Sequence, residues 1–403
     1  MLAERMGRVS ASPTLKVLVA AEQMRQRGID VVEFGAGEPD FDTPDHIKAA
    51  AQAAIAQGFT KYTPAAGTSE LKQAVAAHYK ALYGVEYAAA DVIVTAGGKQ
   101  ALYNVAEVLF NRGDEIITHS PGWPTITEQV KLADAEPVIV RTRPTEGFGL
   151  TAEPFVRAIT PRTKAIVINS PCNPTGALMP ESEMAVLADA VAGRGIWIVL
   201  DLCYEQLIYG QVTHNLPGVL GGRMRDRTIL TGSASKSYAM TGWRCGWLLG
   251  PPQVVSACNA LQSHSTSNVA SISQKAAYAA LTGPQECVRM MLEEYRRRRD
   301  SLHAWLTADP RLACVKPAGA FYLLVDISAL LSADGVRTSA EFAQALLDEA
   351  HVALTAGEAF DAPGFLRISY ATSTDRLREG ANRIQAFIKK LEAAGRIPAQ
   401  TSV

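Results

Sequence analysis

KAIVINSPCNPTGALMPESEMAVLADAVAGRGIWIVLD, residues 164–201, is the stretch that indicates the fold most directly. Its runs KAIVIN (164–169) and IWIVLD (196–201) are almost continuously apolar, which is typical of strands buried on both faces of a sheet. Similar runs recur at 91–95, 115–119, 228–231 and 246–249. Helical stretches such as 98–110 separate them. This alternation predicts right-handed crossovers and an α/β fold with a mostly parallel sheet.

The pattern changes after Pro284 and predicts a second, smaller α+β unit. The elements expected there are a helix at 285–306, a strand at 321–326, a helix at 339–350, a strand at 365–370 and a final helix. The segment before Asp45 is expected to pack with this unit. We therefore predict a large domain of residues 46–284 and a small domain made of residues 1–45 and 285–403.

Composition indicates an enzyme rather than a nucleic-acid or membrane binder. Apolar residues make up 48% of the 403 residues, and 39 basic side chains face 40 acidic ones. A net charge of −1 supplies no bulk attraction for nucleic acid or an anionic membrane, so no such partner is expected. The basic run at 296–299 is flanked by acids, which predicts a solvated, ion-paired helix face.

The cysteines and the hydropathy pattern bear on location. Six cysteines are scattered without C-x-x-C spacing, which argues against a disulfide framework or a zinc site, and no metal is expected. The chain has no run of about 18 apolar residues, the length that a membrane span requires. Together these features favour a reducing, cytoplasmic setting.

Ser233-Ala234-Ser235-Lys236, with Arg244 eight residues later, is the strongest chemical signal. A lysine among small hydroxyl residues can react with an aldehyde, and a nearby arginine can bind a dianion. Pyridoxal phosphate needs both groups. Taken alone, the stretch could also be an ordinary turn before a strand.

Further candidates follow the predicted strands, where ligands bind in open α/β sheets. Gly98 and Lys99 open a helix whose N–H groups could bind phosphate, although glycine is common at such turns. Trp123 could stack on a cofactor ring or belong to the core. Asn173, in Asn173-Pro174-Thr175-Gly176, could donate a hydrogen bond to a ring oxygen.

Three more candidates complete this set. Asp201 ends the run IWIVLD and could keep a pyridine nitrogen protonated, or simply cap the strand. Tyr204 could bond the phenolic oxygen of the same ring. Arg367 lies in a predicted strand and could grip a carboxylate with both arms of its guanidinium, or lie on the surface.

The ordered motifs resemble those of class I pyridoxal-phosphate aminotransferases of fold type I, in particular the bacterial aspartate aminotransferase branch. They are Gly37-Glu38-Pro39-Asp40, Gly97-Gly98-Lys99-Gln100, Asn173-Pro174-Thr175-Gly176, Asp201-x-x-Tyr204 and Ser233-x-Ser235-Lys236 with Arg244. The resemblance spans about residues 12–387. It implies a seven-stranded, mostly parallel sheet with helices on both faces, and a homodimer with shared active sites.

The resemblance also implies a role for each matching residue. Lys236 would hold the cofactor aldehyde and later carry a proton to and from the substrate. Asp201 would pair with the ring nitrogen, Asn173 and Tyr204 would face its phenolic oxygen, and Trp123 would stack on the ring. The phosphate would be surrounded by Gly98, Lys99, Ser233, Ser235 and Arg244, and by Tyr62 of the neighbouring subunit. Arg367 would bind the substrate α-carboxylate near Gly37 and Asn173.

The substrates expected are an amino acid and a 2-oxo acid. In this branch a lysine at the position of Lys99 is associated with acidic substrates, so L-aspartate with 2-oxoglutarate is predicted; alternatively Lys99 only supports the phosphate. Transamination of prephenate with glutamate, aromatic transamination and C–S lyase activity remain alternatives. The sequence departs from the family pattern at Leu202-Cys203 and at Cys245. About 30 residues precede Gly37, which is short for a fused DNA-binding domain.

Overall fold

A large sheet forms the centre of the chain in the computed structural model, which describes residues 2–10 and 13–399. The predicted small domain includes residues 1 and 400–403, which lie outside the described residues. Residue 12, where the resemblance begins, also lies outside them. Within them, seven strands join in the order β2 (Val92–Thr95), β8 (Gly246–Leu249), β7 (Thr228–Ser233), β6 (Trp197–Asp201), β5 (Thr163–Asn169), β3 (Glu115–Ser120) and β4 (Glu136–Arg141).

This sheet is mostly parallel, as predicted. Only β8 runs antiparallel to its two neighbours, β2 and β7. The edge strand β4 was not predicted as a strand, because its residues are mostly half-exposed and the second of them is proline. Half-exposed residues do not give the continuous apolar run by which the other strands were recognised.

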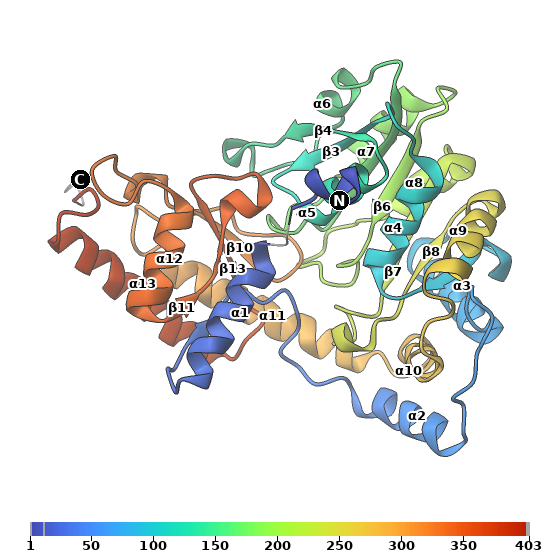
Figure 1. Cartoon of the computed structure of the whole chain (residues 1–403), viewed down its shortest axis with the longest axis horizontal. Coiled ribbons are helices and arrows are strands. Elements are labelled where there is room, and N and C mark those ends of the chain that lie inside the picture. Colours follow the sequence, from blue (N-terminus) through green and yellow to red (C-terminus); the bar gives the residue numbers. More distant parts are fainter. Residues whose placement is uncertain (1, 11–12, 400–403) are drawn as a thin grey trace.

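Helices cover both faces of the large sheet (Figure 1). Alternate strand residues enter different apolar clusters, so that Ile166 and Ile168 face one layer while Ala165 and Val167 face the other. The first layer contains α2 (Asp45–Ala56), α3 (Ser69–Tyr83), α6 (Ala152–Arg157), α7 (Glu181–Val191), α8 (Leu216–Gly221) and α10 (Ser271–Thr282). The second contains α4 (Gly98–Leu109), α5 (Pro124–Leu132) and α9 (Pro252–Ser265).

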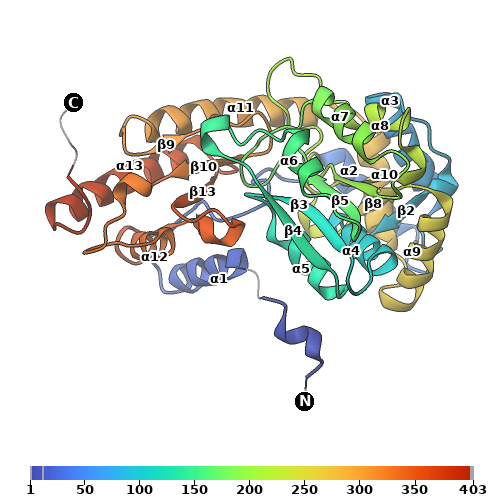
Figure 2. The ribbon, with the colours of Figure 1, turned by 90° about the horizontal axis from the view of Figure 1, so that it is seen from above.

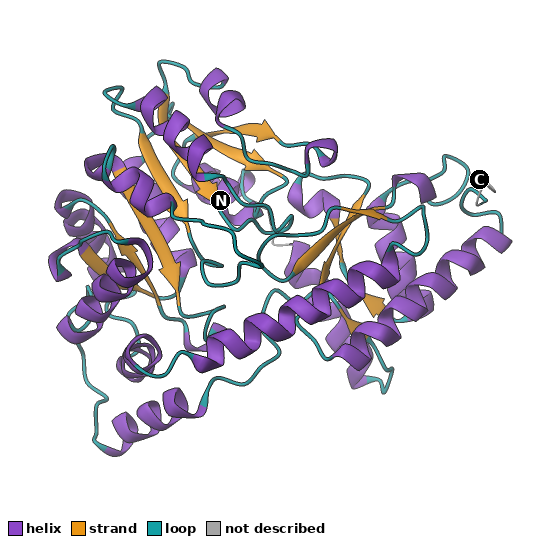
Figure 3. Cartoon of the chain, turned by 180° about the vertical axis from the view of Figure 1, so that it is seen from behind, coloured by secondary structure: helices purple, strands orange, loops and turns teal. Residues whose placement is uncertain are grey.

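The C-terminal part forms a smaller antiparallel sheet with its own apolar cluster. Its strand order is β12 (Thr355–Ala356), β13 (Phe365–Ser369), β10 (Tyr322–Asp326) and β9 (Ala313–Cys314). The helices of this part are α11 (Glu286–Leu306), α12 (Ser339–Ala350) and α13 (Thr374–Ala393). The long helix α11 extends from the large-sheet side of the molecule to the small-sheet side (Figure 3).

Part of the N-terminal segment lies against this smaller unit (Figure 2). Strand β1 (Val32–Glu33) pairs in parallel with β11 (Val352–Ala353), and α1 (Pro13–Gln26) contacts β11 and β12. These contacts agree with the expected packing for residues 13–33. Residues 8–10 contact the predicted large domain instead, since the Ser10 backbone N–H donates to Glu128 at 2.7 Å and Arg8 pairs with Asp134. The exact domain limits stay a prediction. Among the described residues, no helix combines the length and apolar character needed to cross a membrane.

The basic run at 296–299 is only half solvated, so the expectation of a solvated face was wrong for part of it. Its first two arginines are exposed and form ion pairs within their own helix. Arg298 is buried and donates to Asp40 at 2.7 Å, and buried Arg299 donates to the Pro317 carbonyl at 2.9 Å. Consecutive helix residues point about 100° apart, so four in a row cannot share one face.

Candidate active site

The register of the large sheet brings the chemical residues to one edge. Asn169, at the end of β5, lies opposite Asp201, at the end of β6, and Ser233 ends the next strand, β7. Parallel strands end at the same edge, so residues far apart in sequence become neighbours there. Residues 234–236 then continue the chain from the end of β7 to Lys236.

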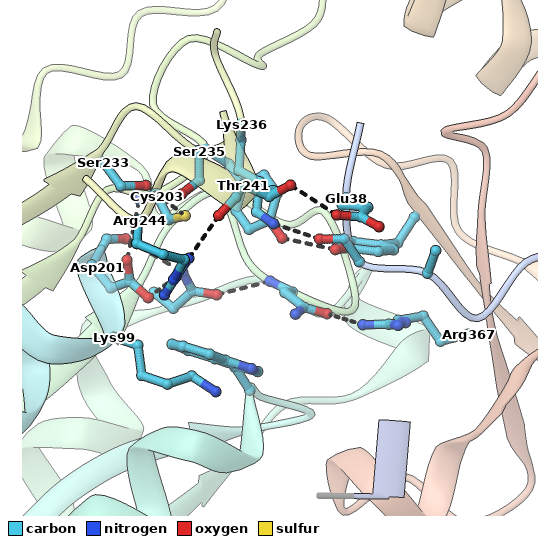
Figure 4. Close-up of a pocket in the computed structure, with 18 of the residues that line it drawn as sticks. Glu38, Lys99, Asp201, Cys203, Ser233, Ser235, Lys236, Thr241, Arg244 and Arg367 are labelled. Atoms are coloured by element: carbon cyan, nitrogen blue, oxygen red, sulfur yellow. Dashed lines mark hydrogen bonds between the residues drawn. The ribbon is translucent and has the colours of Figure 1, made fainter. Parts of the chain in front are cut away.

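A cavity of about 330 Å³ opens at this edge (Figure 4). It is lined by the predicted residues Gly37, Gly98, Lys99, Trp123, Asn173, Asp201, Tyr204, Ser233, Ser235, Lys236, Arg244 and Arg367. Cationic side chains outnumber acidic ones in its lining by four to two: Lys99, Lys236, Arg244 and Arg367 against Glu38 and Asp201. Such a lining favours an anionic ligand.

One end of the cavity has the shape and donors of a phosphate site. Gly97 precedes α4 with a φ of 81°, and a Cβ atom added there would lie 2.7 Å from Arg244 Nη2. The absence of that Cβ leaves room for the guanidinium, whose Nη2 donates to the Ala96 carbonyl just before α4 at 3.3 Å. Ser233 and Ser235 line the same cavity and add hydroxyl donors.

Asp201 is placed to interact with a cationic group in the cavity. It is 3% exposed, and burial raises the pKa of its carboxyl to about 6. The Cys203 backbone N–H donates to Oδ1 at 3.1 Å, and the Asn169 amide donates to Oδ2 at 3.1 Å. A protonated pyridine nitrogen would supply the positive charge that this buried carboxylate lacks.

Lys236 lines the same cavity, is partly buried and donates to the Gly37 carbonyl. Burial lowers the pKa of its ammonium and outweighs Cys203 and Glu38, which raise it; the positive charges of Arg367 and Arg244 lower it as well. The net lowering favours the neutral amine, which is the form that attacks an aldehyde or accepts a proton.

Arg367 lies across the cavity from Asp201 and Arg244 (Figure 4). It is 2% exposed; its Nη1 donates to Asn173 Oδ1 at 3.1 Å and its Nη2 to the Gly35 carbonyl at 2.8 Å. In the part of the chain that the structure describes, its Nε atom has no hydrogen-bond partner. A buried guanidinium with unused donors suits an incoming carboxylate.

The remaining predicted residues lie around these groups, with one exception. Lys99 Nζ is 5.2 Å from the centre of the Trp123 ring, and burial, reinforced by Arg244, lowers the pKa of Lys99. Tyr62 does not line the cavity and is 90% exposed in the single chain. Its predicted contact lies in a neighbouring subunit, so it stays a prediction.

The structure adds lining residues that the sequence reasoning missed: Gly35, Ala36, Asn169, Thr241 and Tyr322. Asn169 ends the strand KAIVIN, so the rule that ligands bind at strand ends could have found it. Tyr322 begins β10 in the small sheet, and no local pattern connects that strand with the cavity. Glu38 and Cys203 also line it; the sequence analysis noted both residues without giving them a role.

Comparison with known proteins identifies the class. The sequence model of the family described as aminotransferase class I and II matches residues 29–384. The chain therefore belongs to the class I and II aminotransferases, and this family membership implies pyridoxal phosphate as cofactor.

Similar proteins narrow the comparison. An aspartate aminotransferase of Geobacillus stearothermophilus is 43% identical, over 96% of this chain and 99% of that protein. An aspartate/prephenate aminotransferase of Cereibacter sphaeroides is also 43% identical, with 96% and 98% covered. The structure of Thermus thermophilus aspartate aminotransferase with maleate superposes with a TM-score of 0.91 at 41% identity, covering 96% of this chain and 99% of that one.

Proposed function

We propose that this protein transfers the amino group of L-aspartate to 2-oxoglutarate, with pyridoxal phosphate held at Lys236. The observation that carries the proposal is Arg367, a buried guanidinium with unused donors in the same cavity as Lys236 and Asp201. This combination supports a reaction at the α-carbon of an amino acid whose carboxylate is held in place.

The lining residues fit the cofactor group by group. Gly98, Lys99 through its backbone, Ser233, Ser235 and Arg244 would hold the phosphate. Trp123 would stack on the ring, Asp201 would pair with its nitrogen, and Asn173 and Tyr204 would face its phenolic oxygen. When bound, pyridoxal phosphate supplies an electron-withdrawing ring that accepts negative charge from the substrate α-carbon.

The side chains would then bind, orient and move protons. Arg367 would clamp the α-carboxylate near the Gly37 backbone, and this clamp favours transamination over decarboxylation, which must release the carboxylate. The neutral Lys236 amine would take the α-proton and return a proton to the product side. Asp201, as an anion, would keep a positive charge on the ring nitrogen.

Lys99 is the residue that we connect with an acidic substrate. Its ammonium could pair with the distal carboxylate of aspartate or glutamate as a point charge. The names of the relatives support aspartate, and those named aspartate/prephenate aminotransferase keep prephenate as a second candidate acceptor. An apolar substrate would leave that ammonium without a partner.

We also propose a homodimer in which Tyr62 reaches the phosphate of the partner subunit. The exposure of its ring in the single chain supports this placement. Mixing Tyr62→Phe and Lys236→Ala proteins tests it. A hybrid dimer would carry both substitutions in one shared site and neither in the other, so activity should rise after subunit exchange. Activity that stays at the sum of the two parents would argue against shared sites.

A visible spectrum of the purified protein before and after L-aspartate tests the function. We expect the absorption of bound pyridoxal phosphate to convert to that of the amino form of the cofactor. The same spectra with L-phenylalanine, and with prephenate plus an amino donor, test the substrate alternatives. Pyruvate release from cystathionine would indicate a C–S lyase instead. A protein that binds no pyridoxal phosphate would refute the proposal.

A further inference from the structure

We propose that Tyr322 is a positioning residue that connects the carboxylate clamp of Arg367 with the hydroxyl of Tyr204. The inference rests on the proposed function, because it assigns a task to Tyr322 within that site. The sequence motifs do not include this residue, and it reaches the cavity from the small sheet.

Tyr322 touches both residues at once. It is fully buried, lines the cavity, and its hydroxyl lies 2.8 Å from that of Tyr204. The guanidinium carbon of Arg367 lies 4.4 Å from the centre of its ring. A Cβ atom added to Gly37 would come within 3.2 Å of the Tyr322 hydroxyl, so the backbone on the substrate side is also close.

The hydroxyl pair has a defined direction once the cofactor is bound. Burial raises the pKa of both phenols, so each hydroxyl keeps its proton at neutral pH. Tyr204 has a single proton, and in the proposed site it donates that proton to the phenolic oxygen of the ring. It must therefore accept from Tyr322. A donor that itself accepts a hydrogen bond is polarised and becomes a stronger donor.

This polarisation has a spectroscopic consequence. With pyridoxal phosphate held at Lys236, loss of the proton from the nitrogen joining the two would leave more negative charge on the ring oxygen. A strong donor at Tyr204 stabilises this charge and lowers the pKa of the nitrogen. Removing the Tyr322 hydroxyl weakens the donor and should raise the pH midpoint of the visible absorption change.

The ring of Tyr322 has a second, separable task. A cation packed on an aromatic face is stabilised, most strongly when both are shielded from water. The ring holds the Arg367 guanidinium from one side while Asn173 and the Gly35 carbonyl hold its arms. Loss of the ring should therefore weaken carboxylate binding, whereas loss of the hydroxyl alone should not.

Four variant holoenzymes separate the two tasks. They carry Tyr322→Phe, Tyr322→Leu, Tyr204→Phe, and Tyr204→Phe together with Tyr322→Phe. Maleate, the dicarboxylate named with the Thermus thermophilus structure, serves as the carboxylate probe. We expect Tyr322→Phe to raise the spectral midpoint by roughly half a pH unit with little change in maleate affinity. Tyr322→Leu should add a loss of maleate affinity of about tenfold. In the Tyr204→Phe background, Tyr322→Phe should cause no further shift, because it acts through Tyr204.

Three results would overturn the inference: an unchanged midpoint in Tyr322→Phe, a shift that persists without the Tyr204 hydroxyl, or unchanged maleate affinity in Tyr322→Leu. Near-ultraviolet circular dichroism of each variant checks that the fold is kept, and Tyr322→Phe preserves the ring and its packing. A wild-type protein without a visible cofactor band would refute the proposed function itself. A normal wild-type titration with an unshifted Tyr322→Phe would refute only the role of Tyr322.

Discussion

Replacing Arg367 by lysine should separate charge from geometry in the proposed carboxylate clamp. A guanidinium has five N–H donors, and two of those of Arg367 bond Asn173 and the Gly35 carbonyl. Three donors remain, among them the unpartnered Nε, which is enough for a two-point grip on a carboxylate. Lysine keeps the positive charge but offers one bond to the carboxylate at best.

The expected size follows from the bond that is lost. A hydrogen bond to a charged group contributes about 1.5–3 kcal/mol. At 1.4 kcal/mol for each factor of ten, Arg367→Lys should lower kcat/KM for aspartate by roughly 10- to 150-fold. Most of the loss should appear in KM, because the clamp holds substrate before and during the reaction alike.

Steady-state kinetics measure the loss of kcat/KM. Maleate binding, monitored by the change in the visible spectrum, measures the loss of carboxylate affinity. Arg157→Lys is a matched control, since the Arg157 side chain is 72% exposed and pairs with Glu153 on its own helix. A substrate amine without the α-carboxylate gives a second control, because it should not distinguish Arg367→Lys from wild type. Unchanged maleate affinity together with a lowered kcat would refute the clamp.

Three further predictions concern the cofactor end and the substrate end of the cavity. Burial raises the pKa of the Asp201 carboxyl to about 6, above its value in the unfolded chain. The folded, cofactor-free protein therefore holds a proton on Asp201 more tightly than the unfolded chain does, and this difference stabilises the fold at low pH. The stabilisation is lost as pH rises through about 6. Between pH 5 and pH 7 the free energy of unfolding by urea should fall by about 1 kcal/mol, and Asp201→Asn should remove that pH dependence. Gly97→Ala should weaken pyridoxal phosphate binding about 10- to 100-fold by displacing Arg244, the arginine proposed to bind the phosphate. Gly113→Ala, with a similar positive φ but open space around its Cβ, should leave cofactor affinity unchanged in the same titration. Lys99→Ala should lower kcat/KM about tenfold for aspartate and leave kcat/KM for phenylalanine unchanged. Lys131→Ala is the control, because it removes a lysine already paired with a glutamate and should affect neither substrate. Equal losses for both amino acids in Lys99→Ala would contradict the side-chain role of Lys99.

The sequence was sufficient for six of the seven strands of the central sheet and for most of the candidate site. Continuous apolar runs such as KAIVIN and IWIVLD identify strands locally, and the predicted stretch 246–249 matches β8. The residues that carry chemistry follow those strands directly, so Asp201 and Lys236 could be chosen before any packing was known. The half-exposed edge strand β4 gave no such signal.

Tertiary structure alone decided which residues from the small unit reach the cavity and which charges are buried. Tyr322 contacts both Tyr204 and Arg367. It lies on the same face of the small sheet as Arg367, because β10 and β13 pair with Leu324 opposite Arg367 and every second residue shares a face. Arg298 is buried because Asp40, 258 positions away, lies against its helix. A sequence pattern reports the periodicity of one segment, which is set by local backbone geometry. Which segments then face each other depends on how all their apolar surfaces are buried together, and no single segment contains that information.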